Sequence, residues 1–475
     1  MEAEGHDNRG GTEVSRDNSR LRDGLADVFE QARAVVGGWL ENEGVPSVMP
    51  RWRMVVEENE AGNGWSGQHV EVNENVLNEG LVELHMASQK VLADWAPTAL
   101  AIAERLRERF SNTRPRPLPF RPPRLDLIGV DEASLDLAAG DVTDMMIEFV
   151  FAPMRWYLGQ LPSVADPDPE LANSVADQVV DLLASGEFIV RQSVALAGLK
   201  TDEDLEEGPA RLRKLSPLER GHFVDVERGP SALMEALAGE IAFIAPTHVL
   251  EVDRPARDIR EVSGLRPPYL ITALQLHQLP VVGTGMVASR VVPEWFGRGI
   301  SGKPIVMRRQ SEEPTRTVTA AQFKLVCSTA EKLKGQRLDD PQRPSETALR
   351  RFGLGCGRED FADALVDFVV ALEALLLPYG DDQRTEMSFR FRLHGAHFIA
   401  GNQMERPALY RQLEQLYSIR SRMVHGGKAP APEEVQAAAR SAHSLGARGL
   451  LKAVTKGFPD GAYFKRAVLG EPQGA

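Results

Sequence analysis

Three polar side chains near the C-terminal end of the chain have the types and spacing for chemistry on a phosphate group. They are Arg420, Ser421 and His425. A guanidinium binds phosphate oxygens and stabilises the negative charge that develops on them, and an imidazole moves a proton to or from a hydroxyl near neutral pH. The three residues are therefore a candidate site for cleavage of RNA phosphodiesters at the ribose 2′-hydroxyl, by a mechanism that needs no metal ion.

An amphipathic helix over Pro407–Val424 is predicted to position these side chains. Arg420 falls near the middle of its apolar arc. Ser421 and His425 lie just beyond one edge of the arc, four residues apart, so their side chains stack. Two glycines follow His425 and end the helix, where the helix dipole stabilises a protonated imidazole. The apolar arc comprises Leu409, Tyr410, Leu413, Leu416, Tyr417, Met423 and Val424, and the opposite face comprises Arg411, Gln415, Ser418 and Arg422.

The same residues also allow a structural interpretation. A guanidinium in an apolar arc is costly to desolvate unless a carboxylate meets it, and Asp367 or Glu373 on an earlier predicted helix would serve. His425 would then be a simple C-terminal cap. Spacing does not separate the two interpretations, because an Arg-x4-His pair is expected about once by chance in a chain of 475 residues with 10 histidines.

Two glycine-rich motifs do not complete a nucleotide site. Gly297-x4-Gly302-Lys303 has the glycine and lysine spacing of a P-loop, but Pro304 stands where a magnesium-binding hydroxyl is needed, so we interpret it as a glycine-rich loop. The run Gly353–Gly357 resembles a dinucleotide loop, yet it lies between two predicted helices and is interpreted as a helix break.

Histidines and cysteines do not predict a metal site. His394 and His397 have no cysteine or third histidine at ligand spacing, which favours two surface histidines. Cys327 and Cys356 are too few for a disulfide framework and fit a reducing compartment. We therefore expect no metal and no cofactor.

Composition excludes a disordered or membrane-embedded chain. The chain is 43% hydrophobic and 26% charged, with no apolar run near the roughly 20 residues of a membrane span and no apolar segment of a signal peptide at its start. We expect a cytoplasmic protein that does not engage a membrane. The net charge is −13, but residues 311–475 carry 23 Lys and Arg against 20 Asp and Glu, a net +3 that permits a polyanion there.

Four segments are predicted along the chain, as expected for a chain of this length. Residues 1–20 are expected to form a disordered leader, and residues 21–112 an N-terminal α+β subdomain. The proline-rich residues 113–124 form a stiff boundary. Residues 125–310 are expected to mix helices and strands in a pattern that defines no fold, and residues 315–460 to form an all-α domain.

Helices and strands within these segments follow from periodicity and from Gly and Pro signals. In the first half of the chain, helices are predicted over Leu21–Leu40, Leu81–Arg109, Leu171–Leu183 and Pro230–Ala238, strands over Ser47–Glu57, His69–Val76, Leu125–Val130, Met145–Phe151, Glu240–Ala245 and Val281–Val292, and an acidic loop over Asp202–Glu207. In the all-α domain, helices are predicted over Thr319–Leu333, Ser345–Gly353, Glu359–Leu377, Ser388–Ala400, Pro407–Val424 and Pro432–Thr455.

The C-terminal third resembles a known family. The run Leu416–Gly426 (LYSIRSRMVHG) is similar to the terminal signature of Apea-like HEPN domains, in which Tyr-x-x-Arg-Ser-x-x-Val-His-Gly closes a helix. Arg358–Asp360 followed by Leu365–Leu376 resembles the helix that precedes it in that family, and Glu386–Arg392 resembles the helix between them. The three segments occur in order over Ala320–Lys456, about a third of the chain.

The resemblance implies an α+β N-terminal region followed by an all-α HEPN-like helical bundle. Many HEPN domains are metal-independent ribonucleases that act as dimers, with paired Arg and His lining a shared cleft. By resemblance, Arg420 and His425 take the catalytic roles. Ser421 occupies the polar position after the arginine, where many active HEPN nucleases carry Asn, Asp or His. The supporting residues are Tyr417, Glu373 and Asp367.

The resemblance further implies an RNA-cleaving effector in toxin or anti-phage defence, with residues 21–310 as a sensor of an unidentified trigger. A homodimer through the C-terminal domain is expected, because one chain supplies a single Arg/His pair and proton transfer at two oxygens needs more. The alternative is a non-catalytic HEPN module that dimerises or binds a nucleotide.

Overall fold

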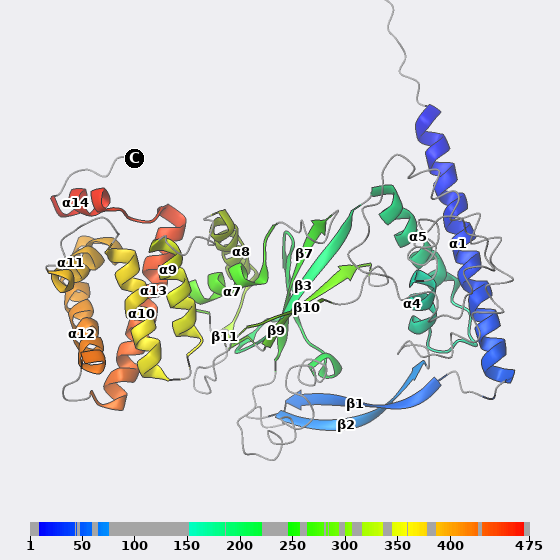
Figure 1. The fold of residues 1–475 in the computed structure, drawn as a ribbon, viewed down its shortest axis with the longest axis horizontal. Coiled ribbons are helices and arrows are strands. Elements are labelled where there is room, and N and C mark those ends of the chain that lie inside the picture. The colour runs from blue at the N-terminus through cyan, green and yellow to red at the C-terminus, as the bar shows by residue number, and fades with distance from the viewer. Residues whose placement is uncertain are drawn as a thin grey trace, which may run out of the picture.

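The computed structural model describes residues 9–42, 44, 48–58, 65–75, 152–185, 187–220, 246–256, 264–279, 282–283, 285–293, 300–305, 316–335, 344–358, 360–377, 386–425 and 430–469. Three parts follow one another along its long axis: helices α1, α4 and α5 at one end, an antiparallel sheet in the middle and a helical bundle at the other end (Figure 1). The elements predicted over Leu81–Arg109, Leu125–Val130, Met145–Phe151, Pro230–Ala238 and Glu240–Ala245, and the proline-rich boundary, lie outside the described residues.

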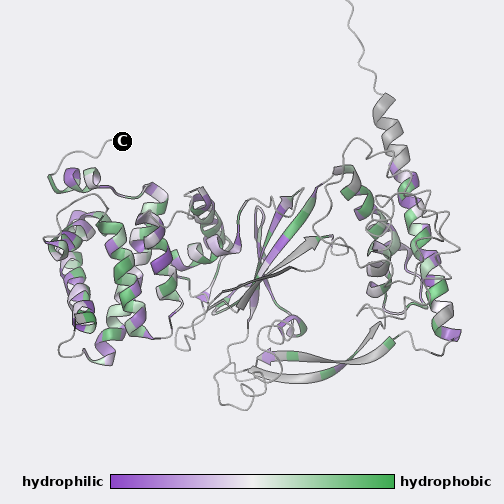
Figure 2. Cartoon of the chain, in the orientation of Figure 1, coloured by the Kyte–Doolittle hydropathy of each residue, from purple (hydrophilic) through white to green (hydrophobic). Residues whose placement is uncertain are grey.

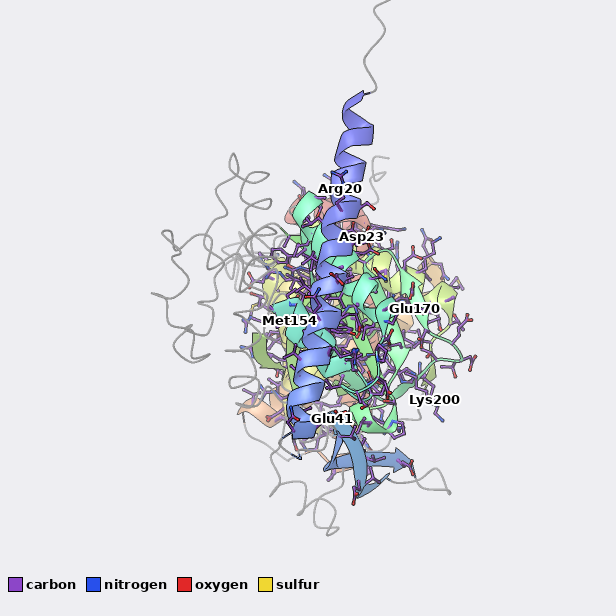
Figure 3. The ribbon with its side chains drawn as sticks, turned by 90° about the vertical axis from the view of Figure 1, so that its right-hand side faces the viewer. Arg20, Asp23, Glu41, Met154, Glu170 and Lys200 are labelled. Carbon is purple, nitrogen blue, oxygen red and sulfur yellow. The ribbon has the colours of Figure 1, made fainter. Side chains whose placement is uncertain are left out.

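Helix α1 (Arg9–Asn42) lies along α4 (Ala152–Gln160) and α5 (Pro169–Ser185) (Figure 3). The helix buries one face because its apolar residues recur every three or four positions. Phe29 stacks on Tyr157 with ring centroids 5.9 Å apart, and Arg33 Nη1 donates to the carbonyl oxygens of Val164 and Ala165, each at 3.1 Å. The buried residues of α1 are Leu21, Leu25, Val28, Phe29, Ala32, Val36 and Leu40.

This packing corrects two expectations. Residues 9–20, which the sequence places in a disordered leader, are helical. Their hydrogen bonds are internal to the helix, so the segment extends α1 beyond Leu21, the first of its buried residues. Helix α1 also packs on α4 and α5, which belong to the next predicted segment, so the boundary predicted at residues 113–124 does not separate two cores.

A hairpin of β1 (Val48–Glu58) and β2 (Trp65–Asn75) confirms the two strands predicted there. The strands pair antiparallel from Val48 opposite Asn75 to Glu58 opposite Trp65. The hairpin crosses below the sheet in Figure 1.

The central sheet has the strand order β10-β9-β3-β7-β6-β5, with β8 also paired to β3, and all neighbours are antiparallel. A short strand β4 (Leu199–Lys200) pairs in parallel with β11 (Arg316–Thr317). The sheet strands are β3 (Phe188–Ala197), β5 (Leu205–Glu207), β6 (Ala210–Lys214), β7 (His248–Ala256), β8 (Val282–Gly283), β9 (Gly285–Val292) and β10 (Ile300–Ile305).

Strands β8 and β9 confirm the strand predicted over Val281–Val292, and α5 confirms the helix over Leu171–Leu183. Two loop predictions are wrong. The second half of the acidic loop is strand β5, because buried Leu205 pairs with Leu212 of β6. Gly302 and Lys303 of the P-loop-like motif lie within strand β10, not in a loop.

Helices α8 to α13 form the bundle and confirm all six helices predicted there. Asp360 caps α10 by accepting from the backbone N–H groups of Ala362 and Asp363. Figure 2 shows α10 as mostly hydrophobic and α12 as mixed. Helices α7 and α14, like α4, were not predicted. The helices are α7 (Pro267–Leu276), α8 (Ala320–Gly335), α9 (Pro344–Cys356), α10 (Phe361–Leu376), α11 (Met387–Ile399), α12 (Arg406–His425), α13 (Pro432–Lys456) and α14 (Gly461–Leu469), with a short 3-10 helix η6 (Gln403–Glu405) before α12.

The helix break predicted over Gly353–Gly357 occurs only at the last residue of that run, because α9 continues to Cys356. Gly355 is needed there for space: a Cβ at this position would lie 2.6 Å from Cε1 of Phe368 on α10. The glycine lets the two helices approach closely.

One continuous hydrophobic core joins the sheet to the bundle. It runs from Val194 of β3 and Leu250 of β7 through Leu274 of α7 and Phe323 of α8 to Phe464 of α14. The core therefore has no break at the boundary predicted between residues 310 and 315. Among the described residues, no helix is both long enough and apolar enough to span a bilayer.

Candidate functional site

Helix α12 presents its predicted apolar face to the core. Leu409, Leu413 and Leu416 are buried, and so is Ile419, which the helical wheel did not place in the arc. Val424, which the wheel did place there, is 49% exposed because the helix ends one residue later.

Polar contacts hold α12 against α11 and α13 in the bundle. On the α13 side, Gln412 Nε2 donates to Ser441 Oγ at 2.7 Å, and Arg422 forms an ion pair with Glu434. On the α11 side, Arg392 forms an ion pair with Glu414 and stacks over the ring of Tyr410 at 5.0 Å. These contacts fix the rotation of α12 and hence the direction of Arg420.

Arg420 lies against Glu373 of α10. Its Nη2 is 3.8 Å from Glu373 Oε2, within ion-pair distance but beyond a hydrogen bond, and the two side chains are 20% and 22% exposed. The buried Nε of Arg420 has no hydrogen-bond partner in the described part of the chain. Burial raises the pKa of Glu373, and the charge of Arg420 opposes this shift only in part. The guanidinium is therefore placed in the bundle but loosely held.

Asp367, the other carboxylate considered for Arg420, has different partners. Arg351 Nη1 and Arg358 Nε each donate to it at 2.8 Å, and its side chain is 2% exposed. The contact raises the pKa of Arg358. Asp367 therefore ties the end of α9 to α10 and does not join the Arg420 group.

The remaining predicted site residues divide into three cases. Tyr417 packs against the core with its ring 5.7 Å from that of Phe391, which is a structural role. Ser421 is partly buried and follows Arg420 on the helix. His425 is the last residue of α12, five residues and about 7.5 Å of helix rise beyond Arg420, and its side chain lies outside the described residues.

The two histidines predicted at the surface lie on α11, but neither is exposed. His394 is buried, donates from Nδ1 to the carbonyl of Leu376 at 2.8 Å, and stacks on Phe464 with centroids 4.1 Å apart. His397 is partly buried, and burial followed by the nearby Arg406 charge lowers its pKa. Over the described ranges, no three His, Cys, Asp or Glu side chains are grouped so as to hold a metal ion.

A group of cations at the start of α12 was not predicted. Lys452 donates from Nζ to the carbonyl of Phe398 at 2.6 Å, and its pKa is lowered by burial and by the charges of Lys456, Arg448 and Arg406. The sequence signal was the spacing of three cations every four residues, at positions 448, 452 and 456. The net charge of residues 311–475 does not reveal this spacing, because acidic residues elsewhere in that segment offset the cations.

A buried histidine in the central sheet was also missed. Thr247 Oγ1 lies 3.2 Å from the carbonyl of Leu199 and donates to it, so it accepts from His248 Nδ1 at 2.8 Å, and His248 Nε2 accepts from Thr201 Oγ1 at 3.1 Å. Burial, with the positive charge of Lys214, lowers the pKa of His248 to about 4. Both ring nitrogens are satisfied, so His248 acts as a neutral bridge between β7 and the end of β4.

Comparison of the chain with protein-family models, with curated protein sequences and with solved structures finds no match.

Proposed function

We propose that the helical bundle is an RNA-cleaving module of the HEPN type, in which Arg420 and His425 act on a phosphodiester. The observation that carries this proposal is the placement of Arg420. Its guanidinium is oriented by α12 and by Glu373, yet Glu373 makes no hydrogen bond to it at 3.8 Å. Two oxygens of a phosphate would supply the bidentate partner that a guanidinium prefers.

The proposed reaction transfers the phosphorus from the 5′-oxygen to the neighbouring 2′-oxygen. The 2′-hydroxyl loses its proton and its oxygen bonds to phosphorus, while the bond to the 5′-oxygen breaks and that oxygen gains a proton. The products are a 2′,3′-cyclic phosphate and a 5′-hydroxyl. Arg420 stabilises the charge on the non-bridging oxygens, and His425 takes or gives one of the two protons.

A second proton-transfer group is required because each turnover moves protons at two oxygens. In the proposed homodimer, the ends of two α12 helices meet and the second chain supplies its own His425. Glu373 acts as a positioning residue for Arg420. At 3.8 Å its carboxylate makes no hydrogen bond to the guanidinium, so that a phosphate competes for it.

Control by the N-terminal region is part of the proposal. The core that runs from β3 through α7 and α8 into the bundle supports it, because a rearrangement of the sheet would reach α10 and α12 through packed side chains.

One alternative has an observation in its favour. Because Arg420 already faces a carboxylate within ion-pair distance, the bundle would also be stable as a non-catalytic module that dimerises or binds a nucleotide.

Cleavage of labelled RNA by the purified full-length protein separates the two functions. We expect His425→Ala to abolish cleavage with little change in melting temperature, because a histidine at a helix end contributes at most about 2 kcal/mol. Arg411→Gln is the matched control, since Arg411 is exposed on the same helix and should leave cleavage unchanged. Cleavage at the wild-type rate by His425→Ala, or loss of cleavage on adding a chelator, would reject the proposed mechanism.

A further inference from the structure

We propose that Arg406, Lys452 and Lys456 form a binding surface for the phosphate backbone of single-stranded RNA at the end of the bundle opposite Arg420. The choice of RNA rests on the proposed function, whereas the anion-binding character of the surface rests on the contacts below.

Two helices bring the three cations together. Helices α12 and α13 are consecutive and antiparallel, so the first residue of α12, Arg406, lies at the same end of the bundle as Lys456, the last residue of α13 (Figure 1). Lys452 lies one turn before Lys456, half-buried over the ring of Phe398 with its Nζ 5.1 Å from the centroid. The effect of Arg406 and Lys456 on the pKa of Lys452 places all three charges within electrostatic reach of one another.

Carboxylates do not neutralise this surface. In the described part of the chain, no carboxylate lies within ion-pair distance of Arg406, Lys452 or Lys456. The acidic side chain of η6, Glu405, is engaged by Arg448 and by the backbone N–H of Gly401. The buried Nε of Arg406 and the buried Nδ1 of the neighbouring His397 have no hydrogen-bond partner there either.

Fold stability alone does not explain the arrangement. Like charges four residues apart on a helix repel, and positions 448, 452 and 456 contain two such pairs. The carbonyl of Phe398 and the C-terminal dipole of α13 favour the two lysines. Arg406, however, occupies the N-terminus of α12, where the dipole favours an anion over a cation. The backbone N–H of Arg406 is already bonded to the carbonyl of Gln403, so a bound phosphate would act on the side chains of Arg406 and both lysines together.

The surrounding charge indicates an extended ligand. Residues 387–469 contain 13 Lys and Arg against 5 Asp and Glu, a net +8, whereas the rest of the chain contains 42 against 63, a net −21. A field of this size attracts a polyanion and repels it from the rest of the molecule. Tyr463 is partly exposed beside Phe398, with centroids 5.6 Å apart, and offers a ring on which an unpaired base can stack.

Arg406 and Arg420 are separated by 14 residues of one helix, about 21 Å. A strand held at Arg406 therefore reaches Arg420 several nucleotides away. The surface would hold the substrate while the other end of the bundle acts on it.

Binding of a fluorescent oligouridylate to the full-length His425→Ala protein tests the inference, with anisotropy measured from about 50 to about 200 mM KCl. When Arg406→Gln/Lys456→Gln is added to this protein, we expect binding at least about tenfold weaker. The slope of log K against log salt should be smaller by about 1.4, because each contact to single-stranded phosphate contributes about 0.7. The matched control is Lys200→Gln/Lys324→Gln, which removes the same charge from two exposed lysines outside the bundle end and should change the slope little. Melting temperatures verify that each variant is folded.

Unchanged affinity and slope in the Arg406/Lys456 variant would overturn the inference, and so would an equal loss of affinity in the control variant. An affinity for duplex DNA equal to that for the oligouridylate would reject single-stranded RNA as the ligand. A charge-preserving Arg406→Lys/Lys456→Arg variant should retain the wild-type slope. Cleavage by the protein with its natural His425 is measured separately, so absence of cleavage with cluster-dependent binding would count against the proposed function and not against this surface.

Discussion

Arg420 Nη2 and Glu373 Oε2 lie 3.8 Å apart, so these two side chains link α12 to α10 by an ion pair without a hydrogen bond. Removal of the guanidinium leaves Glu373 buried without its partner, and the pKa of Glu373, already raised by burial, rises further. Loss of activity in an Arg420 variant therefore needs a separate measurement of folding stability.

We expect Arg420→Met to lower the free energy of unfolding by about 1 to 3 kcal/mol at pH 7, and adding Glu373→Gln to restore most of it because no buried charge remains. The loss in the single variant should be larger at pH 8 than at pH 5, since a carboxyl whose folded pKa is raised loses stability as pH rises through that pKa. Urea denaturation of the four members of the cycle measures both effects. If the double variant is stable but inactive, Arg420 takes part in catalysis. If it is stable and active, Arg420 has no catalytic role.

The proposed dimer predicts a non-linear effect of mixing. When His425→Ala chains are mixed with wild type and allowed to exchange, cleavage should fall below simple dilution, because a mixed dimer has only one histidine at the shared site. Light scattering before and after mixing measures the assembly state. A monomer with full activity would contradict the dimer while leaving the Arg420 assignment open to the cycle above.

Two glycines of α9 should respond in opposite ways to alanine. Gly355→Ala should lower the free energy of unfolding by about 1 to 3 kcal/mol, because the added methyl would lie 2.6 and 2.7 Å from two atoms of the Phe368 ring. Gly353→Ala, two residues earlier with nothing within 4 Å of the new Cβ, should raise it by up to about 1 kcal/mol through helix propensity. Thermal denaturation compares them directly, and equal effects would show that α9 and α10 are not packed as described.

His248 should make stability depend on pH below neutrality. Its pKa in the folded chain is lowered to about 4 from the usual 6.5, so between these two pH values the histidine is protonated in the unfolded chain and neutral in the folded chain. Stability is then constant above pH 6.5 and falls by about 3 kcal/mol as the pH drops to 4. His248→Gln, which can keep one hydrogen bond to a threonine, should lose this component, visible as the difference between the two stability curves. Parallel curves would mean that His248 is not buried in its neutral form.

The sequence predicts those elements whose apolar residues repeat with one period. Helices α8, α10, α12 and α13 each bury a single face, and their bounds are predicted to within a few residues. Strand β7 was missed because both its faces are buried and it also contains Glu251, Asp253 and Arg254, so it has no alternation to detect. Helix α14 is short, and its Phe464 is the partner that buries His394. His394 was therefore predicted at the surface, because the residue that covers it lies 70 positions later, in a helix that the sequence pattern did not predict.

The sequence predicts which residue types form the candidate site, but not which carboxylate pairs with Arg420. Periodicity put Arg420 on an apolar face and offered Asp367 and Glu373 as partners. Only the packing of α10 against α12 selects Glu373, because Asp367 is held by two arginines at the α9 end. Such a choice depends on helix rotation, which a one-dimensional pattern does not contain.

The packing of α1 on α5 has a consequence for synthesis of the chain. Phe29 leaves the ribosome long before Val175, since 146 positions separate them in the sequence. At about 5 to 20 residues per second, the apolar face of α1 stays uncovered for roughly 7 to 30 s. A nascent chain in that interval presents an amphipathic helix without its partner, which is the kind of segment that chaperones bind and that associates with other nascent chains. Slow translation between residues 42 and 169 would lengthen this exposure, whereas slow translation after residue 185 would not.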